Sequence, residues 1–365
     1  MNSVRQCRNG PSRRATWRLS ELAMVALSVV LCCSAVSDDQ PVKLKIVGGL
    51  ASVSQYERLE KPFWERDITA LSNGRIAAEI HPYDRSGLPG PEMLQLMRLG
   101  VVPFGTALLA LAAGDEPELN VVDLPALNPD IQALRRTVGA YRPRIQQILR
   151  TRFGVELLAI YSYPAQVIFC AKPLTGLSDL VGRRVRTSSV GQSEMMTALG
   201  AVPVITPFAE VVTAIRAGVV DCAITGTLSG HEIGLSDVTS YIYPLAISWG
   251  LSFFGANVAA WEAIPSDLQV TLRQAIGRLE QDIWTAAERE TVEGLACDTG
   301  GDACPDGHRP GHMRLVPVTA EDEARRRQLL VQSVLPGWIQ RCGTDCVTLW
   351  NQNLASVVGI TASTD

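Results

Sequence analysis

An arginine at the end of a short β-rich run is the residue of this chain with the clearest chemical role. Arg186 lies in a predicted strand, 184–187, and a predicted helix follows and ends at Gly200. A guanidinium can pair with a carboxylate through two parallel hydrogen bonds, and a helix N-terminus also favours an anion. The spacing therefore predicts a carboxylate pocket at Arg186, whereas Arg183 and Arg184 are expected to be structural arginines.

The elements that must position this arginine alternate between strands and helices. A strand at 202–205, a helix at 209–217 and a strand at 219–224 follow the helix after Arg186. Earlier in the chain, strands at 43–48 and 76–80 enclose a helix at 56–71. This order predicts an α/β fold with strands that are at least partly parallel.

A long helix is predicted after residue 265. The segment 265–269 has the pattern of a capping box, and apolar residues then recur every three or four positions up to Ile283. The pattern can continue to Gly294, which gives a helix of roughly 45 Å. A helix of that length is expected to cross more than one domain.

Several segments resemble a known family, the DctP-type solute-binding proteins of tripartite ATP-independent periplasmic (TRAP) transporters. Residues 179–186 resemble the family's D-L-x-G-x-x-x-R strand, and 210–221 resemble its E-V-x-x-A-x-x-x-G-x-V-D helix and strand. Weaker similarities occur at 73–76, 93–100 and 261–269. Their order and spacing, rather than any single fragment, indicate the family.

The resemblance implies a two-lobe periplasmic-binding-protein-like fold in which a long helix spans both lobes. The first lobe is expected to hold 42–163 and 250–277, and the second 164–249 and 278–365, with a cysteine-rich insert at 297–313. The family's ligand-binding arginine falls on Arg186. The implied function is capture of a small organic acid for a TRAP transporter, without a cofactor or covalent chemistry. In some family members two copies pair through the long helix.

Other candidate ligand residues follow from the same resemblance. A second arginine that is frequent in the family corresponds to Gln166, so the pocket has lost a positive charge and a monocarboxylate is expected. An offset of one or two residues would move this correspondence to a neighbour. The other candidates follow predicted strands or occupy loops that face the cleft in the family: Thr225, Thr227, Thr106, Ser54, Gln55 and Trp249. Each also has a structural interpretation, as a turn residue or, for Trp249, as a buried side chain.

The cysteines that follow residue 37 fall into two groups. Cys170 and Cys222 lie in apolar runs and are expected to be buried and unpaired. The others are expected to form disulfides, either locally or between the insert and the tail: Cys297, Cys304, Cys342 and Cys346.

The insert also contains His308 and His312, which with Cys297 and Cys304 give the pattern C-x6-C-x3-H-x3-H. Thiolates and imidazoles are zinc ligands, but the first spacing is longer than in a usual zinc knuckle. Export favours the disulfide interpretation, so no metal is expected.

The N-terminus has the features of a secretory signal. Five arginines precede or border the apolar run 22–33, and small residues at 35–37 offer a cleavage site. Residues 1–37 are therefore predicted to be a signal peptide, for either ordinary secretion or the twin-arginine route. Its removal takes away five arginines and one glutamate, which changes the formal charge from −4 to −8. A periplasmic protein that does not bind nucleic acid is expected.

The sequence contains no strong enzyme motif, and we expect no enzymatic activity. It lacks a P-loop, a GxGxxG after a strand and an HExxH, and it has four histidines. Two alternative functions remain: a periplasmic sensor that presents its ligand to a receptor, and a secreted metal-binding protein that uses the insert.

Overall fold

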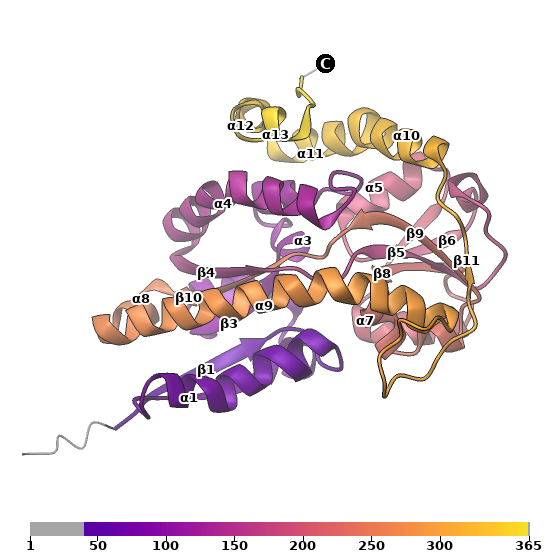
Figure 1. Cartoon of the computed structure of the whole chain (residues 1–365). Coiled ribbons are helices and arrows are strands. Elements are labelled where there is room, and N and C mark those ends of the chain that lie inside the picture. Colours follow the sequence, from indigo (N-terminus) through magenta and orange to yellow (C-terminus); the bar gives the residue numbers. More distant parts are fainter. Residues whose placement is uncertain (1–39, 364–365) are drawn as a thin grey trace, which may run out of the picture. The chain divides into compact units, whose positions relative to one another are not determined.

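Two mixed β-sheets organise residues 40–363, the part of the chain that the computed structural model describes (Figure 1). The predicted signal peptide, 1–37, lies outside the described residues. The strands of the first sheet are β1 (Val42–Gly48), β2 (Ile76–Pro82), β3 (Phe104–Leu108), β4 (Val155–Tyr161) and β10 (Ser252–Asn257). Those of the second are β5 (Gln166–Cys170), β6 (Arg184–Thr187), β7 (Val202–Ile205), β8 (Cys222–Gly226), β9 (Tyr241–Ser248) and β11 (Arg314–Leu315).

In each sheet, parallel strands adjoin an antiparallel partner. The first sheet has the order β2-β1-β3-β10-β4, with β1 parallel to β2 and β3, and β10 antiparallel to β3 and β4. The second has the order β11-β9-β5-β8-β6-β7, with β6 parallel to β7 and β8, and β5 antiparallel to β8 and β9. The chain passes from one sheet to the other after β4 and returns after β9. The α/β prediction is therefore confirmed.

The helices cover and connect these sheets. They are α1 (Ile68–Leu71), α2 (Met93–Arg98), α3 (Leu109–Ala112), α4 (Ile131–Phe153), α5 (Val190–Ala198), α6 (Val211–Arg216), α7 (Thr227–Glu232), α8 (Val258–Glu262), α9 (Ser266–Thr299), α10 (Ala320–Leu329), α11 (Leu335–Cys342), α12 (Asp345–Asn353) and α13 (Ala355–Val358). The helix predicted at 56–71 consists of π-helical turns, Gln55–Glu60 and Phe63–Asp67, followed by α1.

The predicted long helix is α9, whose 34 residues span roughly 51 Å (Figure 1). It contacts β4 in the first sheet and β9 in the second. Its predicted apolar face is buried, since Leu268, Leu272, Ile276, Leu279 and Ile283 are each at most 4% exposed. Burial of this face, rather than helix propensity alone, stabilises so long a helix.

The start of α9 differs from the prediction. Pro265 occupies the N-cap position and no side chain caps the helix, so the predicted capping box is wrong. Gln269 instead donates from Nε2 to the carbonyls of Trp261 and Ile264, both at 3.0 Å. It therefore binds the preceding turn rather than the free amides of its own helix.

Near its C-terminal end, α9 passes very close to α7 at Gly294. A Cβ atom at this position would lie 2.1 Å from the backbone nitrogen of Leu228 and 2.5 Å from the carbonyl carbon of Thr227. Only glycine permits this approach, because the neighbouring atoms belong to the backbone and cannot rotate away. The Thr227 hydroxyl also donates to the carbonyl of Glu290 at 3.0 Å.

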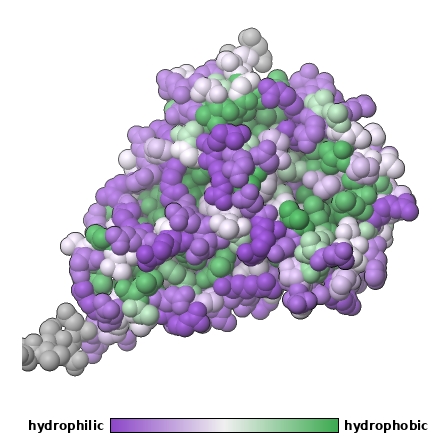
Figure 2. Space-filling model, viewed as in Figure 1, coloured by the Kyte–Doolittle hydropathy of each residue, from purple (hydrophilic) through white to green (hydrophobic). Residues whose placement is uncertain are grey.

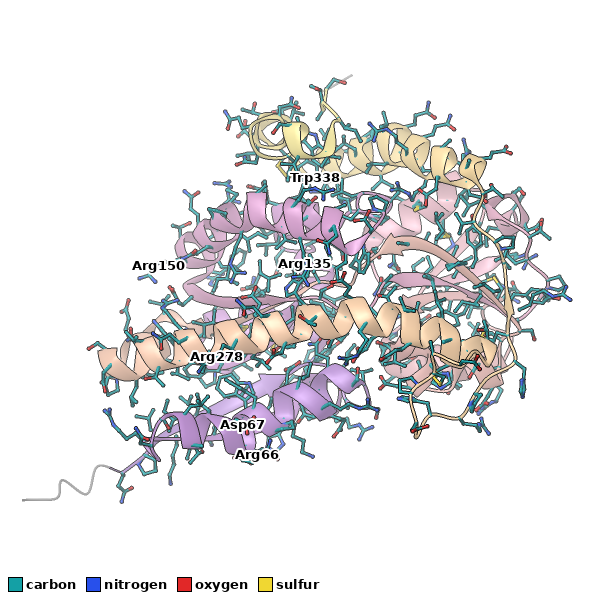
Figure 3. The ribbon with its side chains drawn as sticks, in the orientation of Figure 1. Arg66, Asp67, Arg135, Arg150, Arg278 and Trp338 are labelled. Carbon is teal, nitrogen blue, oxygen red and sulfur yellow. A yellow bond between two sulfur atoms is a disulfide. The ribbon has the colours of Figure 1, made fainter. Side chains whose placement is uncertain are left out.

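The C-terminal helices pack on elements from two different regions. Figure 1 shows α10 to α13 along one side of the molecule, beside α4 and α5. The indole of Trp338 in α11, labelled in Figure 3, donates to the carbonyl of Pro117 at 2.9 Å, and Arg341 pairs with Glu194 of α5. The tail therefore contacts α4 and its preceding segment, which we expected in the first lobe, as well as α5 of the second.

Three disulfides join cysteines of the described residues. Cys297–Cys304 and Cys342–Cys346 correspond to the local arrangement, one of the two that the sequence left open. The third, Cys170–Cys222, shows that the prediction of two unpaired cysteines is wrong. These residues lie directly opposite each other in the β5–β8 ladder, with Cα atoms 4.1 Å apart.

One face of residues 40–363 is largely polar. On the face seen in Figure 2, hydrophilic residues predominate and hydrophobic residues form smaller patches between them. No helix within 40–363 combines the length and apolar character that crossing a bilayer requires.

Candidate functional site

A small cavity lies between the two sheets, where several strands end. Its volume is about 50 Å³. The side chains around it come from the carboxyl ends of β1, β3, β6 and β8 and from the connections that follow β4 and β9. Open α/β sheets bind ligands at the carboxyl ends of their strands, so this cavity is the candidate ligand site.

Arg186 reaches this cavity from β6, where the sequence predicted a carboxylate-binding arginine. Its Nε donates to the carbonyl of Thr206 at 2.9 Å, and Nη1 donates to the carbonyl of Ile224 at 2.6 Å. The Thr206 carbonyl directly follows β7 and the Ile224 carbonyl lies within β8, so both Nε and Nη1 of the guanidinium are held. Among the described residues, none accepts a hydrogen bond from Nη2.

The charge of Arg186 is buried without a counter-ion. Its side chain is 3% exposed, and no carboxylate of the described residues forms an ion pair with it. Burial lowers the pKa of Arg186 to about 10, and only the nearby Tyr83 opposes this shift. A buried cation is costly unless an anion pairs with it. The site therefore has the electrostatic character of an anion-binding pocket.

Gln166, at the start of β5, lies beside Arg186 in the cavity lining. Its Oε1 accepts from Nε2 of Gln192 at 2.6 Å and from the Ser248 hydroxyl at 2.7 Å. Its Nε2 donates to no acceptor within the described part of the chain. The side chain amide is therefore oriented with its donor available to a ligand.

Gly250 leaves space for this amide. It has φ +66°, and a Cβ there would lie 2.6 Å from Nε2 of Gln166. The carboxylate of Asp123 accepts hydrogen bonds from the backbone amides of Trp249, Gly250 and Leu251, at 2.8, 2.8 and 3.1 Å. Burial raises the pKa of Asp123 to about 6 although these three amides act in the opposite direction. Asp123 thus fixes the connection between β9 and β10 that borders the cavity.

The two sides of the cavity differ in chemistry. The side from the first sheet is mainly apolar, with Leu50, Leu108, Ala110 and Leu251, and Tyr163 after β4 adds a phenol whose oxygen accepts from the backbone amide of Leu50. The side from the second sheet carries the polar groups described above, together with hydroxyls and one aromatic ring: Ser188, Thr225, Ser229 and Phe208. A ligand between them would meet its charged partner on one side and hydrocarbon on the other.

Of the residues that the sequence singled out, Arg186, Gln166 and Thr225 come together at this cavity. The Trp249 indole instead donates to the carbonyl of Asn128 at 3.1 Å and is 3% exposed. Thr106 is 1% exposed in β3, and its hydroxyl has no partner among the described residues.

The remaining candidates, Ser54, Gln55 and Thr227, lie near the helices instead. The backbone amide of Ser54 donates to Glu232 at 3.0 Å, and Gln55 donates to Glu60 at 2.7 Å. Thr227 binds α9 as described above. The structure therefore places five of the eight candidates outside the cavity lining.

Sequence reasoning missed the apolar side and the residues that orient Gln166. Leu50 and Leu108 stand at or just after strand ends, a position that could have drawn attention to them. Gln192 and Ser248 carry no comparable signal, because they meet Gln166 only through the packing of α5 and β9 against β5.

A second cavity, of about 150 Å³, lies between α4 and the C-terminal helices. Two of its arginines already have protein partners: Arg326 binds Glu323 and the carbonyl of Ala126, and Arg327 binds the carbonyl of Gly359. None of its lining residues belongs to a strand, so we regard the cavity at Arg186 as the functional site.

Comparison with known proteins gives matches that cover most of the chain. The DctP family model, described as "Bacterial extracellular solute-binding protein, family 7", matches residues 51–296. The C4-dicarboxylate-binding periplasmic protein DctP of Rhodobacter capsulatus is 25% identical over 313 residues, which cover 84% of this chain and 88% of that protein.

Solved structures show the same fold. DctP7 of Bordetella pertussis, an extracytoplasmic solute receptor binding pyroglutamic acid, superposes with a TM-score of 0.74 at 22% identity, covering 87% of this chain and 100% of that chain. A TRAP periplasmic solute-binding protein from Desulfovibrio salexigens with bound orotic acid gives a TM-score of 0.75 at 18% identity, covering 87% and 99%. The two-lobe architecture predicted from the sequence is thereby confirmed.

Proposed function

Because the chain belongs to the bacterial extracellular solute-binding proteins of family 7, we propose that it binds a small organic carboxylate outside the cytoplasm. It would deliver this ligand to the membrane subunits of a TRAP transporter. The family is one of solute receptors rather than enzymes. Pairing of two copies is not supported by the comparisons and forms no part of the proposal.

The observation that carries the proposal is the unpaired, buried charge of Arg186. Its guanidinium is held by two backbone carbonyls, which bring no negative charge, and Nη2 is left without a protein acceptor. A ligand carboxylate would supply the missing counter-charge and accept from Nη2. Exclusion of water around the pair would strengthen it, since the interaction of two charges grows as the local dielectric constant falls.

The surroundings of Arg186 favour an acid with one carboxylate. Gln166 offers a neutral N–H donor where a second cation would be needed to balance a second carboxylate. The opposite side, formed by Leu50, Leu108 and Ala110, suits the hydrocarbon part of a compact ligand. Pyroglutamic acid, bound by DctP7 and DctP6 of Bordetella pertussis, is an acid of this kind.

A thermal-shift screen tests this proposal. The purified protein would be heated with pyroglutamate, orotate, malonate, succinate and malate, and with a sugar and a polyol as uncharged compounds. A true ligand at one hundred times its Kd stabilises the protein by about 2.7 kcal/mol and raises its Tm. We expect an acid to do so in the wild type but not in Arg186→Ala.

Arg183→Ala is the matched control, because Arg183 is a half-buried arginine three residues away that donates to the carbonyls of Lys172 and Pro173 and does not line the cavity. It should respond to ligand as the wild type does. If Arg186→Ala kept the full shift, or if an uncharged compound stabilised all three proteins equally, the assignment of Arg186 would be wrong.

A further inference from the structure

A cluster of nitrogen and sulfur ligand atoms lies around the cysteine-rich insert, and none of its residues lines the Arg186 cavity. One ligand atom each from His231, Cys297 and His308 lies within 4.8 Å of the others. His231 belongs to α7, Cys297 to the end of α9 and His308 to the loop that follows. Three segments that are separate in the sequence therefore converge here.

The histidine that joins this cluster differs from the one that the sequence motif suggested. The pattern C-x6-C-x3-H-x3-H contains His308 and His312, but His312 is not part of the cluster that the described residues form. The second histidine of the cluster is His231, which precedes Cys297 by more than sixty residues in the sequence. The fold therefore assembles a donor set that the local spacing does not reveal.

His231 is oriented as metal-binding histidines usually are. Its Nδ1 lies 3.0 Å from Oδ1 of Asp298, a side chain with no exposed surface. A carboxylate accepts a hydrogen bond from Nδ1–H, which leaves the lone pair on Nε2 free to bind a metal. The other oxygen of Asp298, Oδ2, is buried without a hydrogen-bond partner among the described residues.

Cys304 is not part of this cluster but is bonded to Cys297 in the disulfide form, so its thiolate is the candidate fourth donor. We propose that this disulfide and a metal site are alternative states of the same cluster. When the disulfide is reduced, His231, His308 and the thiolates of Cys297 and Cys304 would bind one soft, tetrahedral ion such as Zn²⁺. When a disulfide oxidant takes two electrons from the two thiolates and is itself reduced to a dithiol, the Cys297–Cys304 bond forms again, the thiolate donors are lost and the ion is released.

A dithiol can act as the reductant that opens the Cys297–Cys304 disulfide. The dithiol supplies two electrons and two protons, the Cys297–Cys304 bond breaks to give two thiols, and the dithiol becomes a cyclic disulfide. Metal binding then displaces both thiol protons, because only the thiolate binds the ion. Thiolate and imidazole are the donor types that tetrahedral zinc sites use.

The geometry requires only local movement. Tetrahedral zinc–nitrogen and zinc–sulfur bonds place neighbouring ligand atoms about 3.3–3.8 Å apart, so the present 4.8 Å must shorten by about 1 Å. The loop after α9 can supply this movement, since His308 is only half-buried. The Nε2 of His308 lies 3.1 Å from Nη2 of Arg58. To bind the metal through Nε2, His308 would have to give up this contact with Arg58. To bind through Nδ1 instead, it would have to lose the proton from that nitrogen.

A cobalt titration tests the proposal. The purified full chain is reduced with a phosphine, which takes oxygen from water and leaves two thiols, and is then titrated with Co²⁺ without air. One Co²⁺ per chain should bind, with the thiolate charge-transfer and tetrahedral d–d bands of a mixed sulfur and nitrogen site. Zn²⁺ should abolish these bands, and the oxidised protein should show none.

Matched variants locate the site. His231→Ala and His308→Ala should each weaken Co²⁺ binding more than about tenfold. His312→Ala, in the same insert but outside the cluster, should bind as the wild type does. A variant with Cys342→Ser and Cys346→Ser removes the other disulfide of the C-terminal region and should also keep the site.

Four results would overturn the proposal, and the first three concern metal binding. These are tight binding that persists in both histidine variants, binding that disappears with Cys342 and Cys346, and a reduced chain that is folded but binds no ion. Circular dichroism would show whether each protein is folded. A reduced chain that unfolds would also contradict the proposal, because the site needs α7 and α9 in their present arrangement. If His231→Ala fails to fold, His308→Ala still tests the proposal, because His308 is only half-buried and its replacement should leave the fold intact.

Discussion

Replacement of Gly294 by alanine should destabilise the protein because of the close approach of α9 to α7. The new Cβ would lie 2.1, 2.5 and 2.7 Å from backbone atoms of Leu228 and Thr227, where ordinary contacts begin near 3.4 Å. The helices must therefore separate by more than about 1 Å, and such overpacking costs about 1–3 kcal/mol, occasionally more. In the opposite direction, alanine has a helix propensity about 1 kcal/mol more favourable than that of glycine. The steric destabilisation should exceed this gain, because all three contacted atoms belong to the backbone.

The same substitution at Gly277 provides a sharp control. Gly277 lies in the same helix, and a Cβ there would have no atom within 4 Å. Gly277→Ala should therefore raise stability by about 0.5–1 kcal/mol through helix propensity alone. The two variants differ from the wild type by one methyl group each, yet their effects should have opposite signs.

Thermal unfolding followed by circular dichroism measures both effects. For a folded unit of this size, a change of 1 kcal/mol moves the Tm by about 1.5 °C, because the unfolding entropy is about 2.1 cal/mol/K per residue. Gly294→Ala should lower the Tm by up to a few degrees, and Gly277→Ala should raise it by about one degree. If both variants were stabilised equally, the α7–α9 approach would be looser than described and the reasoning would fail.

Two further predictions concern charge. Gln166→Arg adds a second cation beside Arg186, which should favour an acid with two carboxylates. Calorimetric titration should therefore show that the ratio of the affinity for malonate to the affinity for pyroglutamate rises at least about tenfold. An unchanged ratio would place Gln166 outside the ligand site. Glu60 is 1% exposed, and burial raises its pKa to about 7 from 4.5. The folded state therefore holds a proton that the unfolded state has lost, so stability should fall by up to about 3 kcal/mol as pH rises from 4.5 through 7. Chemical denaturation across this range should show a shallower decline in Glu60→Gln, and an identical decline would contradict the assignment.

The sequence predicted local elements well because their signals are local. The strand that carries Arg186 has the predicted bounds, 184–187, and the helix after it is capped by Ser189, which accepts from the backbone amide of Gln192 at 3.1 Å. The apolar face of α9 was equally predictable, because a hydrophobic repeat of three to four residues can be recognised without knowing which elements pack against the helix.

What the sequence could not predict depends on which distant segments meet. The Cys170–Cys222 bond requires the register of β5 against β8, two strands separated by β6 and β7 along the chain. The cluster around His231 likewise arises from the packing of α7 on α9. In the candidate site, the arginine was predictable from its strand end, but Ser248, which orients Gln166, was not.

The uneven distribution of polarity around the Arg186 cavity implies an order of events in ligand capture. The groups that attract an anion all belong to the second-sheet side, so an incoming acid would dock there first, before the apolar side contributes. The association rate should then depend on ionic strength, since it follows the attraction between a charged solute and one cation. The apolar contacts of Leu50, Leu108 and Ala110 form later, so they should mainly control how long the acid stays bound. The two sides would thus divide the kinetics between them, one setting the rate of arrival and the other the residence time.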